Sequence, residues 1–159
     1  MTVQHARLQP GVLQGMAALV LDVGFFTSEF RLCDTIAEYL ADILAQSHED
    51  PARYANFSSL LINEIIELAF RSADGTGKVD FHVRKDEERV RICVGFPGGK
   101  DSETIWQFVG GSSNSGPQHG PAGDLKALAR ALDVDIQADI DEDYRVTLSV
   151  EFFLSEDVR

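Results

Sequence analysis

The chain has 159 residues, of which 44% are hydrophobic and 25% are charged, as in an ordinary soluble globular protein. This length suits one domain with its own hydrophobic core. The charge is unusual, because 26 acidic residues outnumber 14 basic ones and the formal net charge is −12. A negative field of this size repels nucleic acid and anionic membranes, so we expect neither as a partner.

The two cysteines and the start of the chain indicate a reducing compartment. Cys33 and Cys93 each lie in an apolar pattern, which predicts buried thiols rather than a disulfide framework or a metal cluster. No apolar run reaches the length of a membrane span, and no basic segment leads from Met1 into an apolar run as in a signal peptide. We therefore expect a cytoplasmic protein.

The first half of the chain predicts one strand and two helices. Residues 1–16 form a polar leader, and the apolar run over 17–25 predicts the first strand. Apolar residues then recur at helical spacing over about 30–46, with acidic residues on the opposite face. Pro51 starts a longer helix over about 51–73, since proline is favoured in the first turn of a helix.

The middle of the chain predicts a hairpin. Apolar and polar residues alternate over 78–85 and again over 88–96, and Asp86-Glu87 forms the tight connection. A turn at Pro97-Gly98-Gly99 then leads into a short helix near 102–109.

Glycine, serine and proline dominate residues 110–121, which predicts a flexible, lid-like loop. A helix over about 123–132 follows the loop. Two alternating runs over 134–140 and 146–152, joined by an acidic turn at 141–143, predict a second hairpin.

Together these elements predict the fold class. Strands with a single apolar face form a sheet that is covered on that face only, and the helices supply the cover. We expect an α/β (α+β) two-layer sandwich with a mixed, mainly antiparallel sheet covered by helices on one face. Residues 17–159 would form this single domain, with the lid-like loop inside it.

The order of elements resembles the GHKL (histidine-kinase-like) ATPase domain over about residues 17–154. It is most similar to the compact anti-sigma-factor type, a small serine kinase that holds or phosphorylates a partner protein. The resemblance implies a homodimeric regulator of a bacterial-type partner-switching pathway. It also implies a protein partner, an anti-sigma-antagonist-like domain, that docks near the glycine-rich loop and the helix at 101–109.

In that family the long helix carries a glutamate that activates water or a substrate hydroxyl and, four residues later, an asparagine that holds Mg²⁺. Glu64 matches the glutamate and is the candidate general base, but the metal position is Leu68, which has no oxygen to offer a hard cation. Asn63 and Glu67 lie beside this register, and successive residues on a helix differ in direction by about 100°. A solvated helix edge remains the alternative for both glutamates. We assign no metal site.

The family also has an aspartate before glycines, after the first hairpin, that reads the adenine amino group. Here Gly98 and Gly99 match the glycines, but the aspartate position is Gly95 or Phe96, depending on the register. An ordinary hairpin exit is the alternative interpretation.

Repeated glycines before a helix allow backbone N–H groups to approach phosphates, and the helix start adds a favourable partial charge. Gly116, Gly120 and Gly123 are the candidates for this contact, although Asp124 at the helix start would repel a phosphate. A plain surface loop is the alternative.

The leading hypothesis is a signalling regulator of the anti-sigma-kinase type that acts by protein–protein binding, with its ATP chemistry weakened or lost. The second is an active serine protein kinase, dependent on ATP and Mg²⁺, with Glu64 as base and Glu67 or Asn63 recruited to the metal. The third is a non-enzymatic dimerisation or scaffold module. No cofactor is assigned firmly, and ATP with Mg²⁺ is the pair that the second hypothesis requires.

Overall fold

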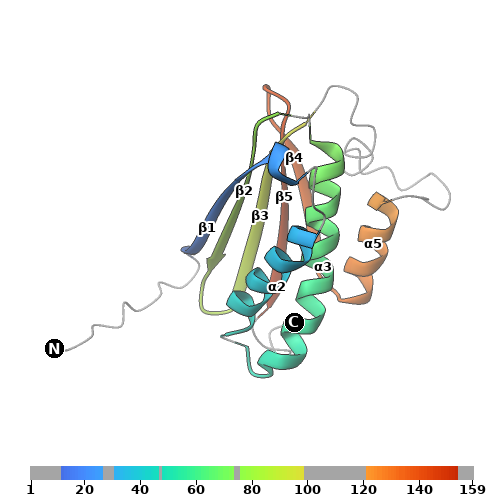
Figure 1. Cartoon of the computed structure of the whole chain (residues 1–159). Helices are drawn as coiled ribbons and strands as arrows, with labels where there is room; N and C mark the ends of the chain where they lie inside the picture. Colours follow the sequence, from blue (N-terminus) through green and yellow to red (C-terminus); the bar gives the residue numbers. More distant parts are fainter. Residues whose placement is uncertain (1–11, 27–30, 47, 74–75, 99–120, 154–159) are drawn as a thin grey trace.

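The computed structural model describes residues 12–26, 31–46, 48–73, 76–98 and 121–153 (Figure 1). Five strands form one sheet in the order β1-β2-β3-β5-β4. The strands are β1 (Gln14–Asp22), β2 (Lys78–Lys85), β3 (Arg89–Pro97), β4 (Asp135–Ile140) and β5 (Arg145–Phe153). The helices are the single turn α1 (Val23–Phe26) and the longer α2 (Arg31–Ala45), α3 (Pro51–Ser72) and α5 (Pro121–Ala131).

The two-layer α+β architecture is confirmed, because α2, α3 and α5 lie on one face of the sheet (Figure 1). The expectation of a mixed sheet is wrong: every strand pairing in the described sheet is antiparallel. Two of the pairings are hairpins. Between β1 and β2, helices α2 and α3 carry the chain away from the end of β1 and back to it, so that β2 runs opposite to β1.

Strand β1 lies about three residues earlier than the predicted run over 17–25. It pairs from Gln14, opposite Lys85, to Asp22, opposite Lys78. Lys78 is the first residue of β2, so no partner strand remains beyond Asp22, and the apolar residues that follow turn into α1. Residues 14–16, which we expected in the leader, therefore belong to the sheet.

One hydrophobic core lies between the sheet and the helices. In β3 the side chains of Val90, Ile92, Val94 and Phe96 are at most 1% exposed and point towards the helices. The alternate residues of β3 point to the outer face of the sheet. Cys93 is one of them and is half-buried next to Ser149. Cys33 in α2 is fully buried. The prediction of two buried thiols is thus right for Cys33 only.

Helix α3 begins with the expected sequence signals. Pro51 occupies its first turn, and the Asp50 side chain accepts a hydrogen bond from the Arg53 N–H at 3.4 Å, which caps the helix. Helix α5 also begins on a proline, so Pro121 belongs to this helix and not to the predicted loop over 110–121. The rest of that loop and the predicted helix near 102–109 lie outside the described residues. None of the described helices is long and apolar enough to cross a membrane.

The β2–β3 turn is organised by a buried aspartate. Asp86 is 4% exposed, and its Oδ1 accepts hydrogen bonds of 2.9 Å from the backbone N–H groups of Glu88 and Arg89. Its Oδ2 accepts a third, of 2.9 Å, from the Arg89 Nε. Asp141 fills a similar role in the β4–β5 turn, where it accepts from the N–H groups of Asp143 and Arg145.

Candidate functional site

The predicted site residues on α3 are half-buried but point in different directions. Asn63 Nδ2 donates a hydrogen bond of 3.2 Å to Oε1 of Glu67, and Arg71 donates one of 3.1 Å to Oε2 of the same carboxylate. These three residues follow one another at spacings of four, so they form a single polar row along the helix. Both carboxylate oxygens of Glu67 are therefore occupied within α3.

The carboxylate of Glu67 also acts on α2. Burial, and then the negative charge of Glu67, raise the pKa of the Cys33 thiol in α2 to about 11. Glu67 is thus close enough to Cys33 to act on it electrostatically. Asn63 Oδ1 is buried and accepts no hydrogen bond from any described residue. Glu67 therefore lies near α2, which packs on α3.

Glu64 and Leu68 lie one turn apart on another side of α3. Glu64 is half-buried, whereas Leu68 is 1% exposed and forms part of the hydrophobic core. The Leu68 side chain has no donor atom and is surrounded by apolar groups, so this position can neither bind a cation nor admit one. Of the two positions that the resemblance to the GHKL family makes catalytic and metal-binding, Glu64 keeps a carboxylate, whereas Leu68 is apolar.

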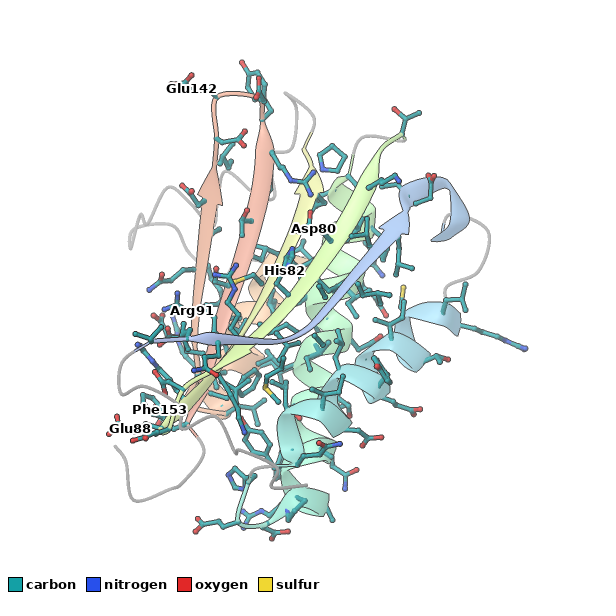
Figure 2. All side chains as sticks on the ribbon, turned by 90° about the vertical axis from the view of Figure 1, so that its left-hand side faces the viewer. Asp80, His82, Glu88, Arg91, Glu142 and Phe153 are labelled. Carbon is teal, nitrogen blue, oxygen red and sulfur yellow. The ribbon has the colours of Figure 1, made fainter. Side chains whose placement is uncertain are left out.

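One of the two candidates for the predicted adenine position also belongs to the core. Phe96 is 0% exposed and points towards the helices. Gly95 points to the outer face instead, where a Cβ atom would lie 2.9 Å from both carboxylate oxygens of Asp80 and 3.2 Å from an Arg145 nitrogen. Asp80 forms an ion pair with Arg145. On the same outer face His82 Nε2 lies 3.3 Å from Oδ2 of Asp80 (Figure 2). In neither register does a carboxylate face the helices at this point of β3.

Gly98 has a local structural reason to be glycine. A Cβ atom there would lie 2.8 Å from a methyl group of Val146 and 2.9 Å from the backbone oxygen of Tyr144. The Gly98 N–H donates a hydrogen bond of 2.9 Å to the same oxygen. Close approach to β5 therefore explains this glycine without a phosphate.

Two of the three glycines of the predicted phosphate contact, Gly116 and Gly120, lie outside the described residues, and so does Gly99 of the turn after the first hairpin. Gly123 is described, and it is the third residue of α5. Its N–H belongs to the first turn, where helix N–H groups have no partner within the helix. In the ranges that the structure covers, no cluster of three or more His, Cys, Asp or Glu residues could hold a metal ion.

A groove that the sequence did not reveal lies at the other end of α3. It has a volume of about 720 Å³ and is lined by the start of α3, the end of α5 and the end of β5. A smaller hollow of about 490 Å³ lies along β1 and β2. The pairing of His48 with Tyr54 in the groove joins residues on either side of the Pro51 break, and no periodic pattern signals such a contact.

The sequence matches no protein family model, and no curated protein sequence is similar to it. Its structure is similar to the catalytic domain of the histidine kinase ThkA in a nucleotide-free form, with a TM-score of 0.51 and 12% sequence identity. The match covers 91% of this chain and all of that domain. At this identity the similarity concerns the fold alone, and the expected fold is confirmed: the chain has the histidine-kinase-like ATPase fold.

Proposed function

We propose that this protein is a signalling regulator that acts by binding a protein partner and in which the ATP chemistry of the GHKL fold is weakened or lost. The fold supports a role of the GHKL signalling type. One observation carries the second half of the proposal: Leu68, at the metal position, and Phe96, one of the two candidates for the adenine position, are both buried in the core, and the other candidate, Gly95, has no side chain to offer.

Each replacement removes a different part of nucleotide binding. Mg²⁺ requires oxygen ligands and keeps its water shell unless carboxylate, amide or phosphate oxygens replace it, and Leu68 offers none. A buried phenylalanine at position 96 accepts no hydrogen bond from an adenine amino group. Without these two contacts, neither Mg²⁺ nor the adenine ring is held in place, so Glu64 has no positioned nucleotide on which to act as a general base.

The partner in this proposal is an anti-sigma-antagonist-like domain near the glycine-rich loop, and the protein forms a homodimer. The two edges of the sheet support the dimer. The edge strand β4 carries Asp135 and Asp139, which discourage pairing with another strand. The edge strand β1 has no charged residue before Asp22, and its Val20 is 55% exposed. Sedimentation should show a dimer that Val20→Lys separates and that Thr35→Lys, on the exposed face of α2, leaves intact.

The loss of ATP chemistry is tested by thermal unfolding with and without 5 mM ATP and Mg²⁺. A ligand at 100 times its Kd stabilises the native state by about 2.7 kcal/mol, which raises Tm by several degrees in a domain of this size. We expect no such rise in the wild type or in Glu64→Gln. A rise in the wild type that Glu64→Gln removes would overturn the proposal in favour of the active serine kinase.

A further inference from the structure

We propose that the groove at the start of α3 binds a basic, amphipathic peptide segment of another protein through an apolar anchor side chain. This proposal goes beyond the proposed function, because the groove is lined by the end of α5, whereas the partner proposed above docks near the glycine-rich loop that precedes α5. It does not depend on the loss of ATP chemistry, because the groove lies at the first turns of α3 and Glu64 is not among its lining residues.

The groove has the size of a binding site. Its volume of about 720 Å³ lies within the range of pockets that take a small ligand or a few peptide residues. Phe153 at its rim lies at the opposite end of the sheet from Glu142 in the β4–β5 turn (Figure 2). The lining residues come from three elements that meet only in the folded chain, and the principal ones are His48, Arg53, Tyr54, Phe57, Leu132 and Phe152.

Aromatic rings form the wall of the groove. The His48 ring stacks on Tyr54 at 4.1 Å and 10°, and Tyr54 meets Phe152 edge-on at 5.8 Å. The Arg53 guanidinium lies 5.7 Å from the centre of the Phe57 ring, and Phe57 and Phe153 are each 44% exposed. Exposed aromatic residues beside a preformed hollow are the usual anchor points of protein interfaces.

A hydrogen-bonding group is buried at the same place. The Tyr54 hydroxyl oxygen is inaccessible to solvent and has no hydrogen-bond partner within the described chain. Burial raises the pKa of this phenol, so the hydroxyl remains protonated and can donate. A ligand in the groove does not reach this hydroxyl, because the oxygen is closed to solvent, so the aromatic surface and not this group supplies the contact.

The charge around the groove selects the sign of the partner. Three exposed carboxylates, on Glu49, Asp50 and Asp133, surround it, and the whole chain carries a net charge of −12. The cation in the lining, Arg53, lies against Phe57 and forms part of the aromatic wall. Complementary charge accelerates association and excludes partners of the wrong sign, so a peptide rich in lysine and arginine is favoured over an acidic one.

The test is a selection of random 12-residue peptides on the immobilised full-length protein, without nucleotide. The proposal expects the enriched peptides to carry a net positive charge and one large apolar residue. Their affinity, measured by fluorescence anisotropy, should fall at least tenfold in Phe57→Ser and in Glu49→Lys. Tyr39→Ser and Glu142→Lys are the matched controls, since Tyr39 is 59% exposed on α2 and Glu142 is exposed on a distant turn. Both controls should bind as the wild type does.

Three results would overturn the proposal: no enriched peptide, enriched peptides without positive charge, or equal binding by Phe57→Ser and the wild type. A dimer in sedimentation that Phe57→Ser separates would also overturn it, because a second copy would then occupy the groove. The Mg-ATP measurement is independent of this selection, so stabilisation by ATP together with basic-peptide binding would reject only the claim of lost ATP chemistry.

Discussion

Asn63 donates a side-chain hydrogen bond to Glu67 one turn further along α3, and Arg71 binds the other oxygen of the same carboxylate. This row accounts for two residues that the sequence placed near a nucleotide. An active kinase with a shifted helix register would have to take Glu67 out of this row to reach a metal ion. We therefore expect Glu67 to contribute to stability, which can be measured.

Glu67→Ala should destabilise the fold by about 1 kcal/mol, because it removes one partly buried hydrogen bond and one partly exposed ion pair. Urea unfolding measures this change, and Glu38→Ala on the exposed face of α2 is the control, expected within about 0.5 kcal/mol of the wild type. The response to Mg-ATP should be the same before and after the substitution. A loss of Mg-ATP binding in Glu67→Ala would assign this residue to a metal site instead.

Leu68→Asn would restore the residue type that the GHKL family has at the metal position. Leu68 is 1% exposed, so the substitution removes a buried apolar side chain and buries an amide, at a cost of roughly 2–5 kcal/mol. Leu60→Asn makes the same change on the same helix at a position that is 58% exposed, and it should cost less than about 0.5 kcal/mol. Equal stability of the two variants in urea would contradict the buried position of Leu68.

Asp86 should make the fold sensitive to acid. Burial alone would raise its pKa, but the hydrogen bonds from the Arg89 side chain and from the Glu88 and Arg89 N–H groups outweigh burial and lower it. A lowered folded-state pKa stabilises the native state fully above the unfolded value of about 3.9, and this contribution disappears as the pH falls through the folded pKa. Asp86→Asn should lose roughly 1–3 kcal/mol at neutral pH and show a smaller further loss in acid than the wild type.

The control for this measurement is Asp139→Asn, which changes an exposed carboxylate on β4. Its unfolding free energy should follow the wild type from pH 7 to pH 3. If Asp86→Asn and the wild type lost stability in parallel over the same range, the stabilising role of the Asp86 carboxylate would be refuted.

Gly95→Ala should disturb the outer face of the sheet. The new methyl group would lie 2.9 Å from the Asp80 carboxylate and 3.2 Å from Arg145, so the ion pair between these residues must shift. We expect a loss of about 1–3 kcal/mol in urea unfolding. In an Asp80→Ala background the contact with the Asp80 carboxylate is absent, so Gly95→Ala should cost at least about 1 kcal/mol less than in the wild type. An unchanged cost would show that the strain arises at another contact.

The local elements could be predicted from the sequence, because their periods and end signals lie within short segments. The helical spacing and Pro51 located α3 within a residue at each end, and the alternation in β2, β3 and β5 identified both hairpins and their inward rows. The identity of Leu68, Gly95 and Phe96 also follows from the sequence, and with it the prediction that the nucleotide motifs are weakened.

Features that depend on partners far along the chain appear only in the folded protein. The end of β1 at Asp22 follows from where β2 begins, and the hydrogen bond of Asn63 to Glu67 follows from the side-chain conformations in the folded helix. The groove at His48, Tyr54 and Phe152 joins segments about a hundred residues apart in sequence, so no local pattern could reveal it. Local propensity sets which elements form, whereas burial and pairing between distant segments set which side chains meet.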